Sequence, residues 1–244
     1  NERSVLFPLN CIHSSLIFHT HFFIISLRNT FRLENTEIMK NLVIGQSGGP
    51  TAVINASLYG AVKAFRESGA DGHVLGMING IEGFLADHVM DLSTDLSDKE
   101  LELLKLTPAA YLGSCRYKLP ADLDSEVYPA IFDNFREMNI GYFLYVGGND
   151  SMDTVDKLSR YAEKIGSDVK FIGIPKTIDN DLVLTDHTPG FGSAAKYVAS
   201  TVREIVLDAS VYQQRSVTIV EIMGRHAGWL TAASRLARKY EGDN

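Results

Sequence analysis

Two aspartates and a lysine crowd together in the segment GIPKTIDNDL, which spans residues 173–182. An apolar run typical of a buried strand ends at Pro175, and Lys176, Asp179 and Asp181 follow it at once. Carboxylates this close repel each other unless cations offset their charge. With a lysine and a divalent ion as the offset, one carboxylate could accept a proton from a substrate hydroxyl. A turn that only ends a strand needs no such set, so we expect general-base chemistry here.

Two glycine-rich segments indicate a second kind of chemistry, the binding of anions. GQSGGPTAVIN contains Gly45 and Gly49 ahead of a helical pattern, and GGNDSMDT places Asp150 and Ser151 where another helix begins. Glycine lets a backbone approach its ligand closely, and a helix N-terminus attracts anions. Neither segment is a GxGxxG or Walker motif, so a plain turn in the first and an N-cap in the second remain alternatives. The Asp150 carboxylate could also hold Mg²⁺, which prefers oxygen ligands.

Basic residues follow two further turns. GSCRYK carries Arg116 and Lys118, and MGRHAG carries Arg225 and His226 between glycines. An arginine at such a junction can bind phosphate with two hydrogen bonds, although GSCRYK is also compatible with an ordinary basic loop. His226 is more simply explained as structural, because no nucleophile accompanies it. Phosphate-binding groups, a metal-suited carboxylate and a spare carboxylate together favour phosphoryl transfer, in which positioning and charge neutralisation do most of the catalysis.

Alternating strands and helices must position these segments. From Met39 onward, the apolar runs KNLVIG, GYFLYVGG, VKFIGIP and SVTIVEIMG read as strands, with GHVLGMI as a weaker one, and helical patterns separate them. One helix has capping-box spacing at Ser97 and Glu100, and another is expected to be interrupted near Pro129. This pattern predicts an α/β fold with a doubly wound, mostly parallel, Rossmann-like sheet in three layers. Ligands of such folds bind beyond the carboxyl ends of the strands, where the segments above lie.

Composition limits the possible partners. The 244 residues carry a formal net charge of −7, whereas nucleic-acid-binding proteins are usually basic. The two cysteines, Cys11 and Cys115, are far apart and form neither a disulfide framework nor a metal-binding spacing. A reduced, cytoplasmic setting is therefore the simplest expectation. We expect small-molecule substrates, with neither nucleic acid nor a membrane as a partner.

Residues 1–38 look unlike the rest of the chain. Their apolar run LIFHTHFFIISL is only about a dozen residues long, against roughly 20 for a spanning helix. No basic stretch closely precedes it, and no small-residue cleavage site follows it. We interpret residues 1–38 as a non-native or disordered extension, and a membrane or targeting segment is the alternative.

Five segments together resemble the phosphofructokinase family, and more narrowly its pyrophosphate-dependent branch: GQSGGPTAVIN, GGNDSMDT, PKTIDNDL, TPGFGSAAKY and EIMGRHAGWLT. The resemblance runs from about Met39 to the end of the chain. It implies an Mg²⁺-dependent glycolytic enzyme that moves a phosphoryl group from pyrophosphate to the 1-hydroxyl of fructose 6-phosphate, giving fructose 1,6-bisphosphate and phosphate. It also implies a homo-oligomer when the protein is complete.

The resemblance assigns the donor through two positions. ATP-using relatives typically read GGDGS where this chain reads GGNDS, and GGTIDND or similar where it reads PKTIDND. Asp150 and Lys176 thus each replace a glycine. A carboxylate at Asp150 adds negative charge where the inner phosphate of a nucleotide would pass, and Lys176 adds a cation suited to pyrophosphate. Repelling one ligand while attracting another is a common route to specificity.

The resemblance also implies a role for each site residue. Asp179 would be the base, Asp181 would support it and the metal, and Lys176 and Thr177 would complete the catalytic set. The donor would be bound by Gly45, Gly49, Arg116, Asp150 and Ser151, with Asp150 as the metal ligand. The sugar phosphate would be bound by Thr177, Asp179, Met223, Gly224 and Arg225.

The family pattern predicts two domains beyond the extension. Residues 39–190 would bind the phosphoryl donor, and residues 191–244 would begin a sugar-phosphate domain that is incomplete. Two other functions remain as alternatives. The protein could be an ATP-dependent 6-phosphofructokinase, or a catalytically incomplete regulatory or partner fragment of the same fold. A dinucleotide-binding dehydrogenase is disfavoured because the GxGxxG motif is missing.

Overall fold

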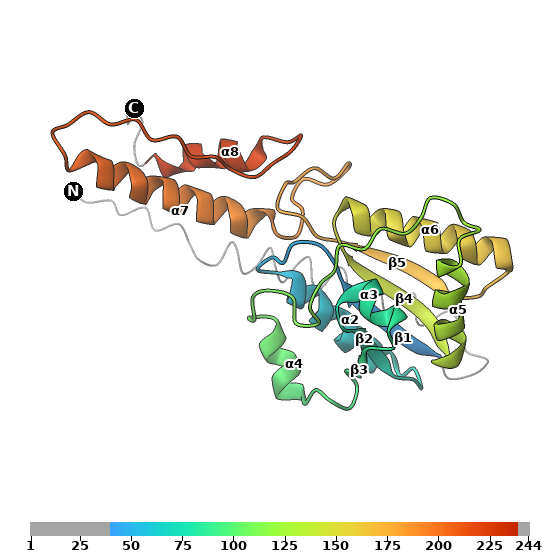
Figure 1. Cartoon of the computed structure of the whole chain (residues 1–244). Coiled ribbons are helices and arrows are strands. Elements are labelled where there is room, and N and C mark those ends of the chain that lie inside the picture. The colour runs from blue at the N-terminus through green and yellow to red at the C-terminus, as the bar shows by residue number, and fades with distance from the viewer. Residues whose placement is uncertain (1–39, 239–244) are drawn as a thin grey trace. The chain divides into compact units, whose positions relative to one another are not determined.

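A five-stranded sheet organises the first part of the chain (Figure 1). The computed structural model describes residues 40–238, so the predictions made for residues 1–38 lie outside the described residues. The strand order is β3-β2-β1-β4-β5. The strands are β1 (Asn41–Gln46), β2 (Val74–Met77), β3 (Val89–Asp91), β4 (Ile140–Gly147) and β5 (Lys170–Pro175). Strand β1 pairs in parallel with β2 and β4, and β3 pairs antiparallel with β2. The predicted mostly parallel α/β fold is confirmed.

Helices cover both faces of this sheet, which explains the continuous apolar strands. In β1, Leu42 and Ile44 pack into one core cluster while Val43 packs into a second. In β4, Leu144 belongs to the first cluster and Phe143 to the second. The first cluster includes residues of α2 (Ile54–Ser68) and α4 (Asp98–Leu104). The second includes residues of α3 (Gly80–Leu85), α5 (Val127–Glu137) and α6 (Asn149–Ile165). The predicted three layers are therefore present.

Local signals set the ends of several helices. Helix α2 ends at Gly69, which adopts the left-handed conformation that glycine tolerates best. Helix α4 begins with the predicted capping box, in which both hydrogen bonds between Ser97 and Glu100 are formed. The interruption expected near Pro129 is wrong. Because α5 begins at Val127, this proline lies in the first turn, where a backbone N–H would have no acceptor within the helix.

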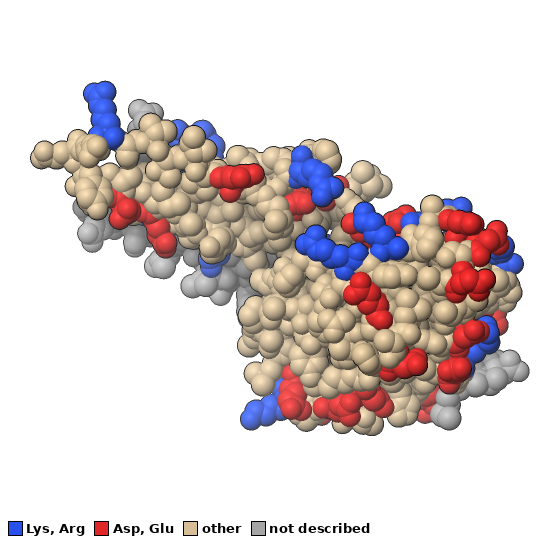
Figure 2. All heavy atoms as spheres, viewed as in Figure 1, with Lys and Arg blue, Asp and Glu red and all other residues tan. Residues whose placement is uncertain are grey.

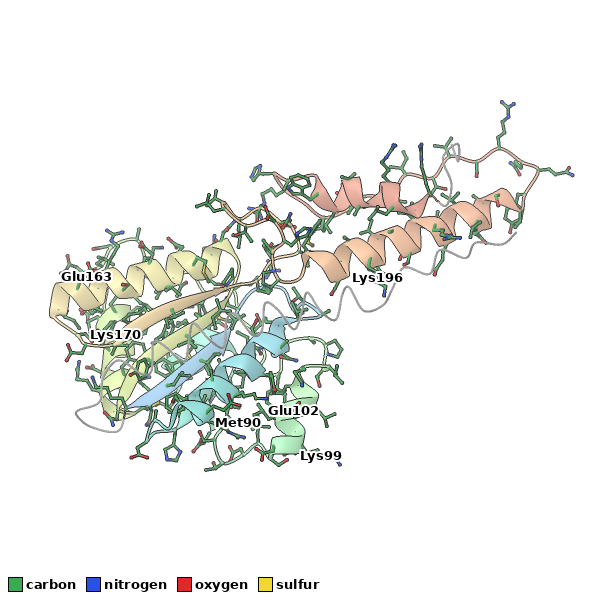
Figure 3. All side chains as sticks on the ribbon, turned by 180° about the vertical axis from the view of Figure 1, so that it is seen from behind. Met90, Lys99, Glu102, Glu163, Lys170 and Lys196 are labelled. Atoms are coloured by element: carbon green, nitrogen blue, oxygen red, sulfur yellow. The ribbon has the colours of Figure 1, made fainter. Side chains whose placement is uncertain are left out.

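Helix α4 is attached to α2 by a cluster of polar side chains. The Tyr59 hydroxyl donates to Glu102 at 2.7 Å and accepts from Lys63 at 2.8 Å. Figure 3 shows Glu102 on the side of α4 that faces α2, with Lys99 on another side. This attachment fixes the start of the segment that leads from α4 towards Arg116 and Lys118.

Residues from Pro175 onward form a second compact unit, which contains α7 (Phe191–Ser210), α8 (Trp229–Ala233) and a 3₁₀ turn (Ser234–Ala237). The strand predicted in SVTIVEIMG is wrong, since residues 215–224 form no regular secondary structure. Val217 and Ile219 are 90% and 91% exposed. A strand needs a hydrogen-bonded neighbour, and none of the described residues of this unit forms one for it. The units divide between Ile174 and Pro175, earlier than the domain boundary predicted after residue 190.

The surface of the first unit carries both signs of charge. Figure 2 shows acidic side chains spread over the visible faces of α4, α5 and α6, with lysine and arginine among them. An anionic ligand must therefore be held by a local group of donors. Separately, the helices within residues 40–238 lack the combination of length and hydropathy that a membrane-spanning segment requires.

The edge strand β3 carries a pH-dependent contact. Asp91 accepts a hydrogen bond from the Ser93 N–H at 2.9 Å and lies 2.7 Å from His73 Nδ1. Burial raises the pKa of Asp91, but the Ser93 and His73 interactions outweigh it and leave the pKa below its ordinary 3.8. A lowered folded pKa means that the ionised form stabilises the fold, and this stabilisation is lost as the pH falls through that pKa.

We therefore expect Asp91→Asn to have a lower free energy of unfolding than wild type at pH 7. The two free energies of unfolding should become equal at pH values below the ordinary pKa of 3.8. Urea unfolding across a pH series measures both. Asp71→Asn, an exposed change nearby, is the control. A gap that persists at low pH would contradict the assignment of the stabilisation to this carboxylate.

Candidate active site

The carboxyl ends of β1 and β4 bring the two glycine-rich segments to one edge of the sheet. Gln46 and Val146 are paired near the ends of these neighbouring parallel strands. Directly beyond them, the Ser47 N–H donates to the Val146 carbonyl at 2.9 Å. Residues 47–53, here called the glycine loop, lead from β1 to α2, and Gly148 leads from β4 to α6. This is the edge at which ligands of open α/β sheets bind.

A third segment joins them at this edge. Residues 113–118, here called the basic loop, contact the glycine loop through two hydrogen bonds. The Ser114 hydroxyl donates to the Gly48 carbonyl at 2.6 Å, and the Gly48 N–H donates to the Cys115 carbonyl at 3.2 Å. Arg116, next in the chain, is exposed. The backbone of the glycine loop and the segment that carries Arg116 are therefore held close together.

Asp150 connects the basic loop to α6. Its carboxylate lies 3.2 Å from Lys118 Nζ, and both side chains are largely exposed. The N-cap of α6 is Gly148, so the N-cap alternative for Asp150 and Ser151 is wrong. Asp150 lies in the first helical turn, where the helix dipole stabilises a negative charge. Ser151 is buried, and its side chain occupies the space that a Cβ on Gly147 would need.

The two predicted donor-binding glycines occupy different environments. Gly45 is inside β1, where a Cβ would collide with the side chains of Met77 and Tyr145. Packing within the sheet therefore accounts for this glycine. Gly49 is exposed, and a Cβ built there would meet no atom within 4 Å. Of the two, Gly49 is the one placed to present its backbone to a ligand.

In the second unit, the loop after β5 holds Asp179 in a defined conformation. The Thr177 N–H donates to the Pro189 carbonyl at 3.1 Å, and the Thr188 hydroxyl donates to the Thr177 carbonyl at 2.7 Å. The Asp179 N–H donates to the Thr177 hydroxyl at 3.1 Å. Asp179 Oδ1 is buried without a hydrogen-bond partner among the described residues. A buried oxygen in this state is costly and calls for an explanation.

Lys176 and Asp181 flank Asp179 with opposite burial. Lys176 is 5% exposed, and Asp181 is exposed. Burying an ammonium group is costly without compensating polar contacts. The three charged residues that the sequence places together thus differ in burial. The Lys176 cation is buried, the Asp179 carboxylate is half-buried and the Asp181 carboxylate is exposed.

Asn180 and Thr188, which sequence reasoning missed, organise this loop. Asn180 adopts a left-handed conformation with φ of 55° and is 9% exposed. Its Nδ2 donates to the Asp186 carbonyl at 2.9 Å, and its Oδ1 accepts from the Thr188 N–H at 2.8 Å. Asparagine tolerates this conformation better than most residues. The asparagine between two aspartates could therefore have been used to predict a turn at this position.

The predicted sugar-binding segment lies against the same small core as the Asp179 loop. Ile178 and Ile222 both pack on the cluster formed by Ala195, Leu230 and Ala233. Their chain neighbours are Asp179 and Met223, and Met223 and Arg225 are exposed. Gly224 has φ of 145°, and a Cβ there would collide with the Ala227 carbonyl. The second unit therefore brings the Asp179 loop and the predicted sugar-binding segment to one cluster.

The predicted residues are divided between the units. The first unit holds Gly45, Gly49, Arg116, Asp150 and Ser151. The second holds Lys176, Thr177, Asp179, Asp181, Met223, Gly224 and Arg225.

The described residues include no group of three or more His, Cys, Asp or Glu side chains placed to hold a metal ion. Mg²⁺ needs fewer protein ligands, because it keeps several waters and is usually bound by one or two carboxylates together with substrate phosphates. The exposed Asp150 carboxylate beside the glycine loop and the basic loop fits this limited role. A donor phosphate would have to supply further ligands.

The model of the family described as Phosphofructokinase matches residues 41–241. The chain belongs to the phosphofructokinase family. The resemblance read from the five motifs is thereby confirmed at the level of the family. The strand-end loops described above are thus those of a phosphofructokinase fold.

Individual relatives match with high coverage of this chain. A pyrophosphate–fructose 6-phosphate 1-phosphotransferase of Halomonas elongata is 46% identical over 208 residues, which cover 83% of this chain and 49% of that protein. The crystal structure of a pyrophosphate-dependent phosphofructokinase from Nitrosospira multiformis matches with a TM-score of 0.77 and 43% identity, covering 84% of this chain and 51% of that one. An ATP-dependent 6-phosphofructokinase of Actinobacillus pleuropneumoniae is 31% identical over 82% of this chain and 57% of that protein. This phosphofructokinase chain spans about half the length of the first two relatives.

Proposed function

We propose that the protein transfers a phosphoryl group from pyrophosphate to the 1-hydroxyl of fructose 6-phosphate, with Mg²⁺ as cofactor. The observation that carries the choice of donor is the Asp150 carboxylate, paired with Lys118 at the edge where the glycine loop and the basic loop meet. Support comes from the 46% identity to a pyrophosphate-using relative, against 31% to an ATP-using one.

The first unit supplies groups suited to a small, highly charged donor. The Gly49 backbone, Arg116 and Lys118 are suited to phosphate oxygens, and the helix dipole of α6 favours negative charge at its N-terminus. A bound Mg²⁺ would neutralise oxygens of pyrophosphate, with Asp150 as its protein ligand. Lys118 would then exchange its contact with Asp150 for one with the donor.

The second unit supplies the base and the acceptor-binding groups. Asp179 takes the proton of the 1-hydroxyl, and the hydroxyl oxygen forms a bond to the terminal phosphorus of pyrophosphate. The bond from that phosphorus to the bridging oxygen breaks, and phosphate leaves with its electron pair. The unpartnered, buried Oδ1 of Asp179 supports this role, because it has a free lone pair for the proton. Lys176 offsets negative charge, Thr177 contacts the transferred group, and Met223, Gly224 and Arg225 bind the sugar phosphate.

An assay with both donors tests the proposal. Because the chain spans about half of its relative, we would measure it alone and as a chimera completed with the part of the Halomonas elongata protein that this chain does not span. Formation of fructose 1,6-bisphosphate should depend on pyrophosphate and Mg²⁺ and be negligible with ATP. Turnover with ATP and none with pyrophosphate would establish the ATP-dependent alternative.

A non-enzymatic role is the second candidate, and the share of the relatives that this chain spans favours considering it. A regulatory or partner polypeptide would keep the fold and bind no sugar. Isothermal titration of the chain with fructose 6-phosphate separates the cases: measurable binding supports the enzyme, and its absence in chain and chimera alike supports the alternative. A cytoplasmic location and a homo-oligomer stay part of the proposal.

A further inference from the structure

Two buried side-chain amides lie behind the donor loops. Gln46 and Asn55 are 0% and 1% exposed, and they contact each other through Gln46 Nε2 and Asn55 Oδ1 at 3.0 Å. Buried amides are costly unless they are hydrogen-bonded, and apolar residues would fill this space more cheaply. We call this pair the amide junction.

The amide junction closes the base of the glycine loop. Gln46 is the last residue of β1, and Asn55 lies in the first turn of α2, so the whole glycine loop runs between them. Besides its bond to Asn55, Gln46 Nε2 donates to the Ile54 carbonyl at 3.3 Å. The two ends of the glycine loop are thus joined through side chains.

The same junction holds the segment that leads into the basic loop. Asn55 Nδ2 donates to the Thr107 carbonyl at 2.8 Å, and Asn55 Oδ1 accepts from the Tyr111 N–H at 2.8 Å. Gln46 Oε1 accepts from the Leu112 N–H at 2.9 Å. Residues 107–112, which directly precede the basic loop, are therefore held by the same two side chains that join the ends of the glycine loop.

We infer that Gln46 and Asn55 are positioning residues that couple the glycine loop to the basic loop, so that both present their anion-binding groups as one preorganised surface. The coupling rests on contacts within the first unit, whereas the ligand, pyrophosphate, rests on the proposed function. Neither amide lies at the surface, so both act through the loops. Holding binding groups in place before the ligand arrives raises affinity by reducing the ordering that binding requires.

Hydrogen exchange of the whole chain tests the coupling without any ligand. In Asn55→Ala, the amides of Tyr111, Leu112 and Gly48 should exchange about tenfold faster. This is the change expected when the free energy of local opening falls by the contribution of one buried hydrogen bond. Val62→Ala is the matched control, since Val62 is a fully buried apolar residue of the same helix. It should lower global stability without selective exchange at these amides. Equal exchange in the two variants would overturn the inference.

A milder variant keeps the test decisive if Asn55→Ala does not fold. Gln46→Met keeps the length of the side chain and adds no charge, and it loses the acceptor of the Leu112 N–H and the donor to the Ile54 carbonyl and Asn55. In this variant, hydrogen exchange should be faster at the Leu112 amide and nearly unchanged at the Tyr111 amide, which keeps its acceptor on Asn55. A uniform change across all of α2 would indicate general destabilisation and count against a specific junction.

Pyrophosphate affinity then tests positioning in a double-mutant cycle. Titration of pyrophosphate with Mg²⁺ should show weaker binding in Gln46→Met and in Arg116→Ala, and the double variant should lose less than the two single losses combined. Additive losses would contradict the coupling. Wild-type chain that binds no pyrophosphate, while the exchange results hold, would sink the proposed donor and leave the junction intact.

Discussion

Replacement of Asp179 by alanine should lower the turnover of phosphoryl transfer by about 10²- to 10⁴-fold, the usual contribution of a positioned general base. Pyrophosphate affinity should change little, because the predicted donor-binding residues belong to the first unit and Lys176 is kept in this variant. The effect should fall on kcat more than on KM, since the proton is transferred only on the way to the transition state.

The unpartnered oxygen of Asp179 separates lost chemistry from lost structure. Its Oδ1 is buried without a hydrogen-bond partner among the described residues, so removing the carboxylate should not destabilise the fold. Thermal unfolding of Asp179→Ala should therefore match or exceed that of wild type. Asp186→Ala, an exposed aspartate of the same loop, is the control for the change in charge and should keep its turnover. Near-normal turnover of Asp179→Ala in the chimera would remove its role as the base.

The architecture of the first unit could be predicted because its determinants are local. Strand β4 is apolar on both faces, since Phe143 and Leu144 enter different cores, and the resulting unbroken run identified a buried strand. The ends of α2 and α4 are set by Gly69 and by the Ser97–Glu100 pair, within one turn of each helix. Such signals remain readable in sequence because the interacting residues are close along the chain.

Other features depend on partners that are distant in the chain or missing from the described residues. The contacts of Gln46 with Leu112 and of Asn55 with Thr107 span 66 and 52 residues. No periodicity reveals them, so neither amide was predicted to matter. The segment around Val217 and Ile219 has strand-like composition, yet composition alone cannot form a ladder. The donor-binding role of Gly45 stays a prediction, because a glycine required by packing looks the same in sequence as one that faces a ligand.

The double change Asp150→Gly with Lys176→Gly should shift donor preference from pyrophosphate towards ATP. The ratio of kcat/KM for ATP to that for pyrophosphate should rise by about 10- to 100-fold, since juxtaposed like charges cost several kcal/mol in recognition. Removing Asp150 takes away a carboxylate that is 78% exposed at the start of α6 and would repel a nucleotide phosphate. It also releases Lys118 for the longer phosphate chain. Removing Lys176 takes away a cation that favours pyrophosphate.

The single variants separate the two effects. Asp150→Gly removes both the repulsion of ATP and the proposed Mg²⁺ ligand, so it should raise kcat/KM for ATP and lower kcat/KM for pyrophosphate. Lys176→Gly should lower kcat/KM for pyrophosphate alone. A matched control is Asp156→Gly with Lys170→Gly, which removes one negative charge from α6 and one positive charge from β5. Figure 3 shows Lys170 at the beginning of β5. The control should lose some stability and keep its preference. If all these variants share the wild-type preference, discrimination depends on other residues, and neither the Asp150 repulsion nor the Lys176 attraction can explain the choice of donor.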